Sequence, residues 1–331
     1  MFNTTKVCSY ITIILFAFFQ NIYAQDPAFT QFYANPIYLN PAMAGSANCP
    51  RLSLNHRNQW PSLKGAYLTT SFSYDKGVEL LHGGIGLQVL NDMQGEGALS
   101  NTQISAIYSY QLQINENITL LTGLQATYQQ RALDKSKLFF GDQIDPNYGF
   151  VLMTQENVNL FADNVNYTDF STGLTIFSKK YFLGLAIHHL TEPDDAFISE
   201  SYLPRRLTIH TGTNIPIGKY KSMGIVMDGP FITPNLLYMS QNGAQQLNIG
   251  LSLTNASFSG GLYFRNNISN SDAILIVIGY ESNGLRLGYS YDYTISELMG
   301  ASGGAHEVSL TLQMACRTKR KKLKAIKCPK F

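Results

Sequence analysis

The chain has 331 residues, of which 14% are charged, 45% are hydrophobic and 12% are aromatic, and its net charge is +2. Soluble proteins usually carry about a quarter charged residues, so this composition is unusual for a soluble enzyme. After the N-terminus no run of 18 or more apolar residues could cross a bilayer as a helix, which excludes a helical membrane protein. A closed sheet in lipid fits, because its strands alternate apolar and polar positions.

Residues 1–24 have the pattern of a signal peptide. Lys6 supplies a positive charge, residues 7–19 are almost entirely apolar, and Ala24 precedes Gln25 as the small residue at a cleavage site. The apolar stretch is too short for a membrane anchor, which is the alternative. We therefore expect a mature chain that begins near Gln25 and lies outside the cytoplasm.

The cysteines give little guidance. Cys8 leaves with the signal peptide, and Cys49, Cys316 and Cys328 remain, an odd number without CxxC spacing. This pattern supports neither a zinc site nor a disulfide framework, and no cofactor is expected. A single bridge between Cys316 and Cys328 stays open.

Residues 25–50 are rich in Pro and Asn and are expected to form an extended strap. The residue before a proline avoids the helical region, and an Asn-Pro pair occurs twice, five positions apart. The strap could plug the lumen of a barrel, face a partner, or be a mere linker. Its candidate plug or partner-binding residues are Gln31, Phe32, Tyr33, Asn35, Pro36, Tyr38, Asn40, Pro41 and Gly45.

Residues 51–315 alternate apolar and polar positions in segment after segment, which predicts strands. Many segments have about ten residues, the length that a tilted strand needs to cross a membrane. The fourteen predicted strands lie near 51–60, 66–76, 83–91, 99–112, 117–130, 169–178, 181–190, 205–216, 222–239, 247–253, 256–265, 272–280, 285–293 and 308–314.

These strands predict an all-β fold, an outer-membrane barrel of about 14 antiparallel strands. A soluble sandwich or propeller is the alternative, but a propeller needs a repeat and the sequence has none. Tyr and Phe also gather near strand ends, as at Tyr108, Tyr181 and Tyr289, where an interfacial girdle would place them. Residues 132–168 are too polar and too long for a tight turn, so we expect a long loop or inserted lobe there.

The last segment, residues 316–331, is a basic tail. Eight of the 24 basic residues lie in the last fifteen positions, whereas all 22 acidic residues lie between Asp26 and Glu307. Such a tail can meet anionic lipid or an acidic partner, or simply stay solvated. We expect it in the periplasm, since an even number of strands leaves both chain ends there. Its named basic residues are Arg317, Lys319, Arg320, Lys321, Lys322 and Lys324.

Several motifs resemble those of the PorP/SprF family of type IX secretion membrane proteins. The most specific is QFYANPIYLNPAMAG at residues 31–45, which follows QDP at 25–27. Further matches are RNQWP at 57–61, HGGIG at 82–86, LFFGDQ at 138–143, HHLT at 188–191, GYSYD at 288–292 and HE at 306–307. The matches follow in order along nearly the whole mature chain.

This resemblance implies an outer-membrane barrel of the Bacteroidetes type, with no enzymatic activity, in the type IX secretion and gliding system. Some members are core components of the machinery, and others export or anchor one large surface adhesin through its C-terminal sorting domain. The implied partners are that adhesin, other secretion components in the periplasm or outer membrane, and the lipid bilayer. Nucleic acid is not expected.

Five histidines are candidates for metal ligands or catalysts, namely His82, His188, His189, His210 and His306. His188 and His189 are adjacent, so on a regular strand they point to opposite faces and cannot hold one ion together. The same holds for His306 and Glu307. Hydrogen bonding at strand ends is therefore expected, and no metal site.

Three functions follow from the sequence. The first is a non-enzymatic secretion or adhesin-attachment barrel, and the second is a porin-like channel for small solutes. The third, a membrane hydrolase, lacks a GxSxG elbow and a nucleophile with a nearby base.

Overall fold

The computed structural model describes residues 25–47, 49–178, 181–222, 225–228, 230–267, 270–296 and 298–315. The predicted signal peptide (1–24), the basic tail (316–331) and a Cys316–Cys328 bridge lie outside the described residues. Among the described residues, Cys49 is disulfide-bonded.

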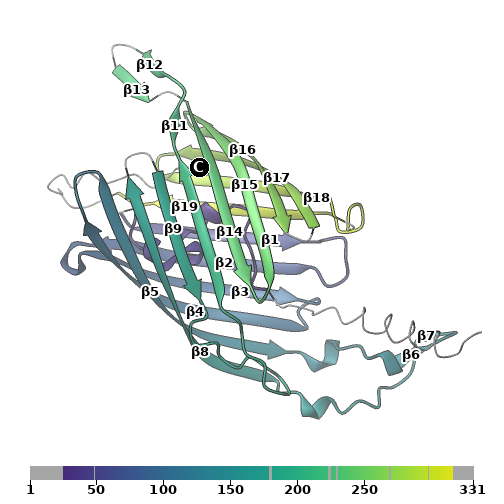
Figure 1. The fold of residues 1–331 in the computed structure, drawn as a ribbon. Helices are drawn as coiled ribbons and strands as arrows, with labels where there is room; N and C mark the ends of the chain where they lie inside the picture. Colours follow the sequence, from purple (N-terminus) through teal and green to yellow (C-terminus); the bar gives the residue numbers. More distant parts are fainter. Residues whose placement is uncertain are drawn as a thin grey trace, which may run out of the picture.

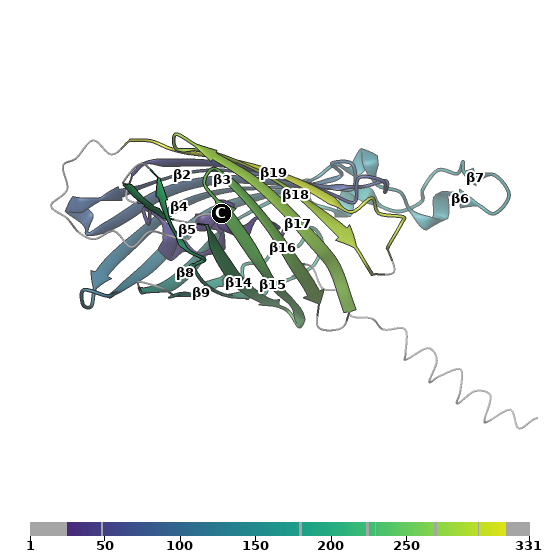
Figure 2. The same ribbon diagram turned by 90° about the horizontal axis from the view of Figure 1, so that it is seen from above.

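Fourteen antiparallel strands form one closed barrel (Figures 1 and 2), as the sequence predicted. The order around the wall is β10-β9-β8-β5-β4-β3-β2-β1-β19-β18-β17-β16-β15-β14, and β10 pairs with β14 to close it. The strands are β1 (Arg51–Gln59), β2 (Tyr67–Val78), β3 (Gly83–Gln94), β4 (Leu99–Gln113), β5 (Ile118–Leu133), β8 (Asn164–Ser178), β9 (Tyr181–His188), β10 (Arg206–Thr213), β14 (Phe231–Gln241), β15 (Ala244–Asn255), β16 (Phe258–Asn267), β17 (Asn270–Ser282), β18 (Leu285–Thr294) and β19 (Ala305–Gln313).

Two predicted boundaries were wrong. The segment 222–239 is not one strand: β14 begins at Phe231, and a hairpin of β12 (Lys219–Ser222) and β13 (Ile225–Asp228) precedes it. The short β11 (Ile215–Pro216) extends the barrel beside β14. The long insertion is residues 134–163 rather than 132–168, because β5 continues to Leu133 and β8 already begins at Asn164.

The wall is apolar outside and polar inside, the reverse of a soluble barrel. On β15, for example, Asn248 points inward and is 1% exposed, whereas its neighbour Ile249 is 49% exposed on the outer face. Leu87, Ile104 and Leu124 are likewise exposed on the outer face of other strands. Such an outer surface suits contact with lipid, as in outer-membrane barrels.

The two ends of the barrel differ. At the end where β1 begins, which we call the β1 mouth, most turns are tight, and the β12–β13 hairpin projects there (Figure 1). The opposite end, which we call the long-loop mouth, carries residues 134–163, 189–205 and 295–304. Residues 134–163 contain η4 (Lys135–Lys137), η5 (Gly141–Gln143), β6 (Ile144–Asp145), β7 (Gly149–Phe150) and η6 (Val158–Leu160).

The N-terminal segment lies inside the barrel (Figure 1, purple). It forms three short helical turns, η1 (Phe32–Ala34), α2 (Pro36–Leu39) and η2 (Pro41–Met43). In the part of the chain that the structure describes, no helix has the length and apolarity to span a membrane. The side chains of the segment build a core with inward-facing residues of the wall. This core comprises Phe32, Tyr33, Leu39, Ala42 and Met43 of the segment and Leu121, Phe177, Phe182, Leu237, Tyr263, Ala273 and Leu275 of the strands.

Inward-facing glycines let the segment approach the wall. A Cβ atom at Gly123 of β5 would lie 2.3 Å from the backbone nitrogen of Ala42, and one at Gly84 of β3 would lie 2.3 Å from the carbonyl oxygen of Ala44. Both contacts are with backbone, which cannot swing away. Side chains at these positions would therefore push the segment off the wall.

Candidate functional site

Residues 26–45, which we call the plug, run through the lumen from the long-loop mouth to the β1 mouth. Asp26 lies beside His189 and Arg206, close to the long loop 189–205. Gly45 at the other end donates its backbone N–H to Asp75 of β2, 2.8 Å away, near the β1 mouth. The chain thus crosses the lumen before it enters β1.

All nine residues that the sequence singled out in this segment lie inside the barrel. Eight of them are buried, and Tyr38 is half-buried. They contact the inner wall, so they do not form an outer surface for a partner. The observed conformation differs from the expected extended strap, because each Asn-Pro pair starts a helical turn. Pro36 and Pro41 occupy the first position of α2 and η2, where a missing N–H costs nothing.

The two asparagines before these prolines fix the plug to the wall. Asn35 donates from Nδ2 to Ser71 Oγ at 2.8 Å, and Asn40 donates to Thr175 Oγ1 at 3.1 Å. The Asn40 side chain also accepts from the backbone N–H of Ala42 at 2.9 Å, which caps η2. Asn40 thus serves both its own turn and a strand, whereas the Asn35 side chain binds the wall, where it also accepts from Gln88 Nε2 of β3 at 3.2 Å. Replacing either amide would leave buried polar groups without partners.

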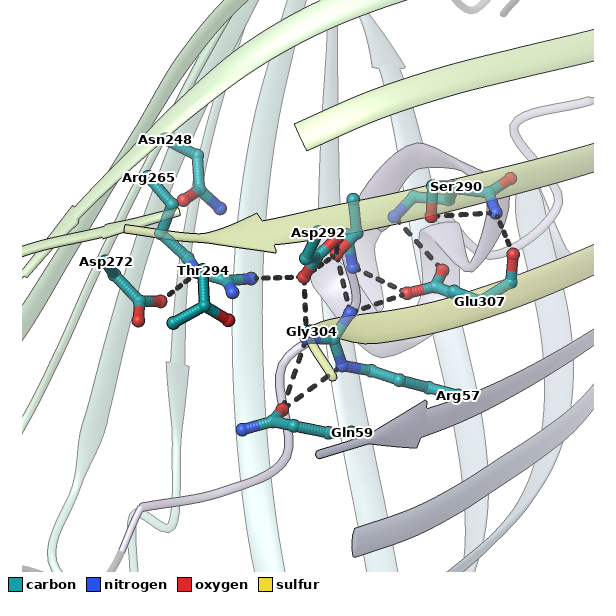
Figure 3. A network of polar contacts seen from close by, with 12 residues as sticks. Arg57, Gln59, Asn248, Arg265, Asp272, Ser290, Asp292, Thr294, Gly304 and Glu307 are labelled. Atoms are coloured by element: carbon teal, nitrogen blue, oxygen red, sulfur yellow. Dashed lines mark hydrogen bonds and ion pairs between the residues drawn. The ribbon is translucent and has the colours of Figure 1, made fainter. Parts of the chain in front are cut away.

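A charged network holds the upstream part of the plug (Figure 3). Arg57 of β1 forms ion pairs with Asp292 of β18 at 2.8 Å and with Glu307 of β19 at 3.4 Å. Arg265 of β16 pairs with the same Asp292 at 2.9 Å and also with Asp272 of β17. Charged residues from five strands of the wall, β1, β16, β17, β18 and β19, thus meet here.

The plug completes this network. The backbone N–H groups of Thr30 and Gln31 donate to the Glu307 carboxylate at 2.7 and 3.0 Å, and Thr30 Oγ1 donates to Asp292 at 2.7 Å. Two carboxylates on the wall therefore accept hydrogen bonds from the plug and from Arg57. A buried ion pair of this kind is stable only while every partner is present.

A second charged cluster holds the start of the plug. The His189 ring binds Asp26 through Nε2 at 2.7 Å and Asp169 of β8 through Nδ1 at 2.8 Å, and Arg206 lies 3.0 Å from the same Asp26 oxygen. Arg206 also donates to the Tyr38 hydroxyl at 3.0 Å. Residues from β8, from β10 and from the loop after β9 thus hold the first acidic residue of the plug.

The pKa values of this cluster agree with its geometry. Burial favours a neutral Asp26, but the charges of His189 and Arg206 and the hydrogen bond from His189 outweigh it and hold the Asp26 pKa well below its usual range. Burial likewise disfavours a charged His189, but Asp26 and the hydrogen bonds to Asp169 and Asp26 raise its pKa to about 9. At neutral pH both groups are charged.

The expectation that His188 and His189 point to opposite faces of a strand was wrong. β9 ends at His188, and His189 takes a positive φ of 59°, so the two side chains do not alternate as on a strand, and both are buried. His189 has the strand-end hydrogen-bonding role expected of it. His306 and Glu307 do alternate: Glu307 is buried, and His306 is exposed beside Tyr289 and Tyr291.

A third charged contact lies near the β1 mouth. Arg51 and Asp75 form a buried ion pair at 2.8 Å, and Asp75 also accepts from Gly45. The plug is thus bound to charged wall residues at its start, in its upstream part and at its end.

The cavities that lie beside the plug among the described residues are small. Cavities of about 20, 30 and 40 Å³ lie beside Asp26, Gln25 and Phe32, respectively, and each has room for at most a few water molecules. A hollow of about 1360 Å³ includes outward-facing Leu251, Phe264 and Ile276 in its lining, so it opens on the outer side of the wall.

The sequence places this barrel in a family. Residues 21–312 match the model described as "Type IX secretion system membrane protein PorP/SprF". The chain belongs to the PorP/SprF family. The predicted resemblance is therefore confirmed, and the plug and nearly all of the wall lie within the matched residues. No curated protein sequence matches the chain.

Three solved structures are similar to this PorP/SprF chain at low sequence identity. The Pseudomonas putida toluene transporter TodX has 9% identity and a TM-score of 0.48, with 83% of this chain and 92% of that chain covered. The CymD monoaromatic hydrocarbon channel has 11% identity and a TM-score of 0.47, with coverages of 86% and 94%. A Pseudomonas aeruginosa FadL homologue has 10% identity and a TM-score of 0.44, with coverages of 83% and 92%.

The functional reading of the sequence missed the wall partners of the plug. Arg57 and Asp292 lie in PorP/SprF motifs to which the sequence assigns no role, Glu307 is expected only to form hydrogen bonds at a strand end, and Arg206 and Asp169 lie outside the motifs. Their signal is a charge at an inward position of a membrane strand, where charges are rare. The named basic residues 317–324 lie outside the described residues.

We predict that Arg57→Met lowers the free energy of unfolding by about 3–5 kcal/mol, because it leaves buried Glu307 without its cation and buried Asp292 with Arg265 alone. Unfolding in urea in detergent micelles, followed by the fluorescence of the single Trp60, measures this. The control is Arg205→Met, since Arg205 is 58% exposed and pairs with Glu192 at the surface. It should cost less than about 1 kcal/mol. Equal losses for both variants would contradict the structural weight given to the network.

We also predict a pH dependence from His189. Its folded pKa of about 9 is above the ordinary 6.5, so its stabilisation is complete below about pH 6.5 and is lost as the pH rises through about 9. The melting temperature of the wild type should fall across this window, and that of His189→Gln should be nearly flat. Identical alkaline losses in both proteins would count against the cluster.

Asp26 acts on the acid side of the pH range. Its lowered pKa gives stability that is lost as the pH falls below about 4.

Proposed function

We propose that this chain is a non-enzymatic outer-membrane component of the type IX secretion and gliding system of the Bacteroidetes type. In this proposal it exports or anchors a large surface adhesin by binding the C-terminal sorting domain of that adhesin. The observation that carries the proposal is the filled lumen. Because the plug occupies the barrel along its length, a large cargo must be held at a mouth and not inside.

The asymmetry of the two mouths supports a division of roles. Long loops stand at one mouth, and long loops of outer-membrane barrels face the outside of the cell. We assign cargo binding to residues 134–163 at this mouth. We assign contact with periplasmic secretion components to the β1 mouth and to the basic tail, residues 316–331, which follows β19. The mature chain would begin after removal of the signal peptide at residues 1–24.

The first test is deletion of residues 135–162 with a short Gly-Ser joint between β5 and β8. The barrel should still fold, because both strands and their register are kept, while the adhesin should leave the cell surface and appear in the medium. Surface proteomics measures the amount of adhesin on the loop-deletion strain and on a strain that lacks the whole gene. Retention of the adhesin at the surface in both strains would refute the proposed function.

The alternative is a porin-like channel for small solutes. The plug predicts that the purified protein passes little current in planar bilayers, since the cavities beside it among the described residues are about 20, 30 and 40 Å³. An unrelated open porin at the same protein concentration provides the comparison. A steady conductance similar to that of the porin would favour the channel.

A further inference from the structure

We propose that residues 134–163 and 189–205 form one docking surface for a protein domain that presents apolar side chains surrounded by lysine and arginine. The inference rests on the proposed function, in which this domain is the C-terminal sorting domain of the adhesin. It adds the chemistry of the contact and the second loop.

The two loops are joined into one body. Arg131 at the end of β5 pairs with Asp195 and lies over the ring of Phe197 at 5.2 Å, and Ala162 donates its backbone N–H to the Phe197 carbonyl at 2.9 Å. Residues 189–205 are also closed on themselves, since Asp195 donates its N–H to the Ser201 carbonyl at 3.0 Å. A partner that lies on one loop therefore meets the other.

Large apolar side chains on these loops are exposed beyond the strand ends. Met153 is 93% exposed, Tyr148 is 78% exposed and Phe139 is 75% exposed, and Phe139 packs on Phe150 with ring centroids 5.5 Å apart. The other exposed members of the set are Ile144, Val151, Leu152, Leu160, Ile198 and Tyr202. So many exposed apolar side chains on polar loops are typical of a surface that a partner covers.

The surface is acidic. The two loops contain nine acidic residues against three lysine and arginine residues, Lys135, Lys137 and Arg205. The charged His189 is buried and pairs with Asp26 and Asp169, which lie outside the two loops. Four of the carboxylates accept hydrogen bonds from backbone N–H or hydroxyl groups, and none of the four belongs to an ion pair among the described residues. They are Asp142, Asp145, Asp194 and Glu200. A partner with a basic rim around an apolar centre complements this pattern.

The acidic charge also favours a protein over a lipid surface. Figure 2 shows residues 134–163, with β6 and β7, extending away from the strand ends instead of folding back along the outer wall. A membrane with anionic headgroups would repel a surface with excess carboxylates. The apolar side chains are therefore placed to meet a protein in front of the mouth.

The experiment uses the full-length barrel in detergent and the purified C-terminal sorting domain of the adhesin that the gene-deletion strain loses from its surface. Affinity is measured by titration with wild type, with Phe150→Ser combined with Met153→Ser, and with Leu80→Ser as the matched control. Leu80 is 87% exposed, but it lies at the β1 mouth. We expect the double variant to bind at least about tenfold more weakly and the control to bind as wild type.

A second set of variants tests the charges. Asp142→Asn, Asp145→Asn, Asp194→Asn and Glu200→Gln are combined, because these changes keep the hydrogen-bond acceptors of the turns and remove only the charge. Wild-type affinity should fall as salt rises from about 0.05 to about 0.5 M, and the neutralised variant should show a much smaller dependence. Glu116→Gln, in an exposed turn at the β1 mouth, is the control.

The outcomes separate the two proposals. The docking surface is refuted if the sorting domain binds all variants as tightly as wild type, or if it does not bind the wild type. The proposed function is tested separately, by whether the adhesin leaves the cell surface in the strain that lacks the gene. A separate experiment tests whether the loops lie on lipid instead. An environment-sensitive dye is attached to the cysteine of Met153→Cys, and its fluorescence is measured in proteoliposomes. A blue shift without the sorting domain would place the loops on the membrane and overturn the proposal, and a shift only on its addition would support it.

Discussion

The polar inner face of the wall needs hydrogen-bond partners, and much of the structure depends on how the plug supplies them. A barrel in lipid turns its apolar residues outward, so buried carboxylates and guanidinium groups are left on the inside. Asp292 and Glu307 accept from Arg57, but they also accept from Thr30 and Gln31 of the plug. The plug is therefore part of the interior of the fold, and a family function that required an open lumen would first have to break these contacts.

The strands were predictable because their cause is local. A period of two over about ten residues indicates a membrane strand whatever its neighbours are, and this located all fourteen. The prediction of one strand over residues 222–239 failed because this run contains the end of a hairpin, β12–β13, and then the start of β14. Where a strand ends inside a run of strand-forming residues depends on pairing with another part of the chain, which a local pattern does not contain.

The site was predictable only in part. The Asn-Pro pairs and the aromatic residues indicated that residues 31–45 are more than a linker, but the pre-proline rule was read too strictly, since each proline begins a helical turn. The wall partners are far away in sequence: Asp26 meets His189, and Thr30 meets Glu307. No spacing rule connects such pairs, and the positive φ of His189 broke the strand rule that was applied to it.

The position of the Arg57 network has a consequence for how the barrel is assembled. β1 and β19 are the first and last strands, and nine residue pairs between them, including Arg57 with Glu307, join the two ends of the wall. Thr30 and Gln31 bind at this same junction. Pairing the first strand with the last and seating the plug satisfy the same buried charges, so the two steps are thermodynamically coupled. A barrel that closed without the plug would bury Glu307 at the junction of β1 and β19 without the hydrogen bonds that Thr30 and Gln31 donate.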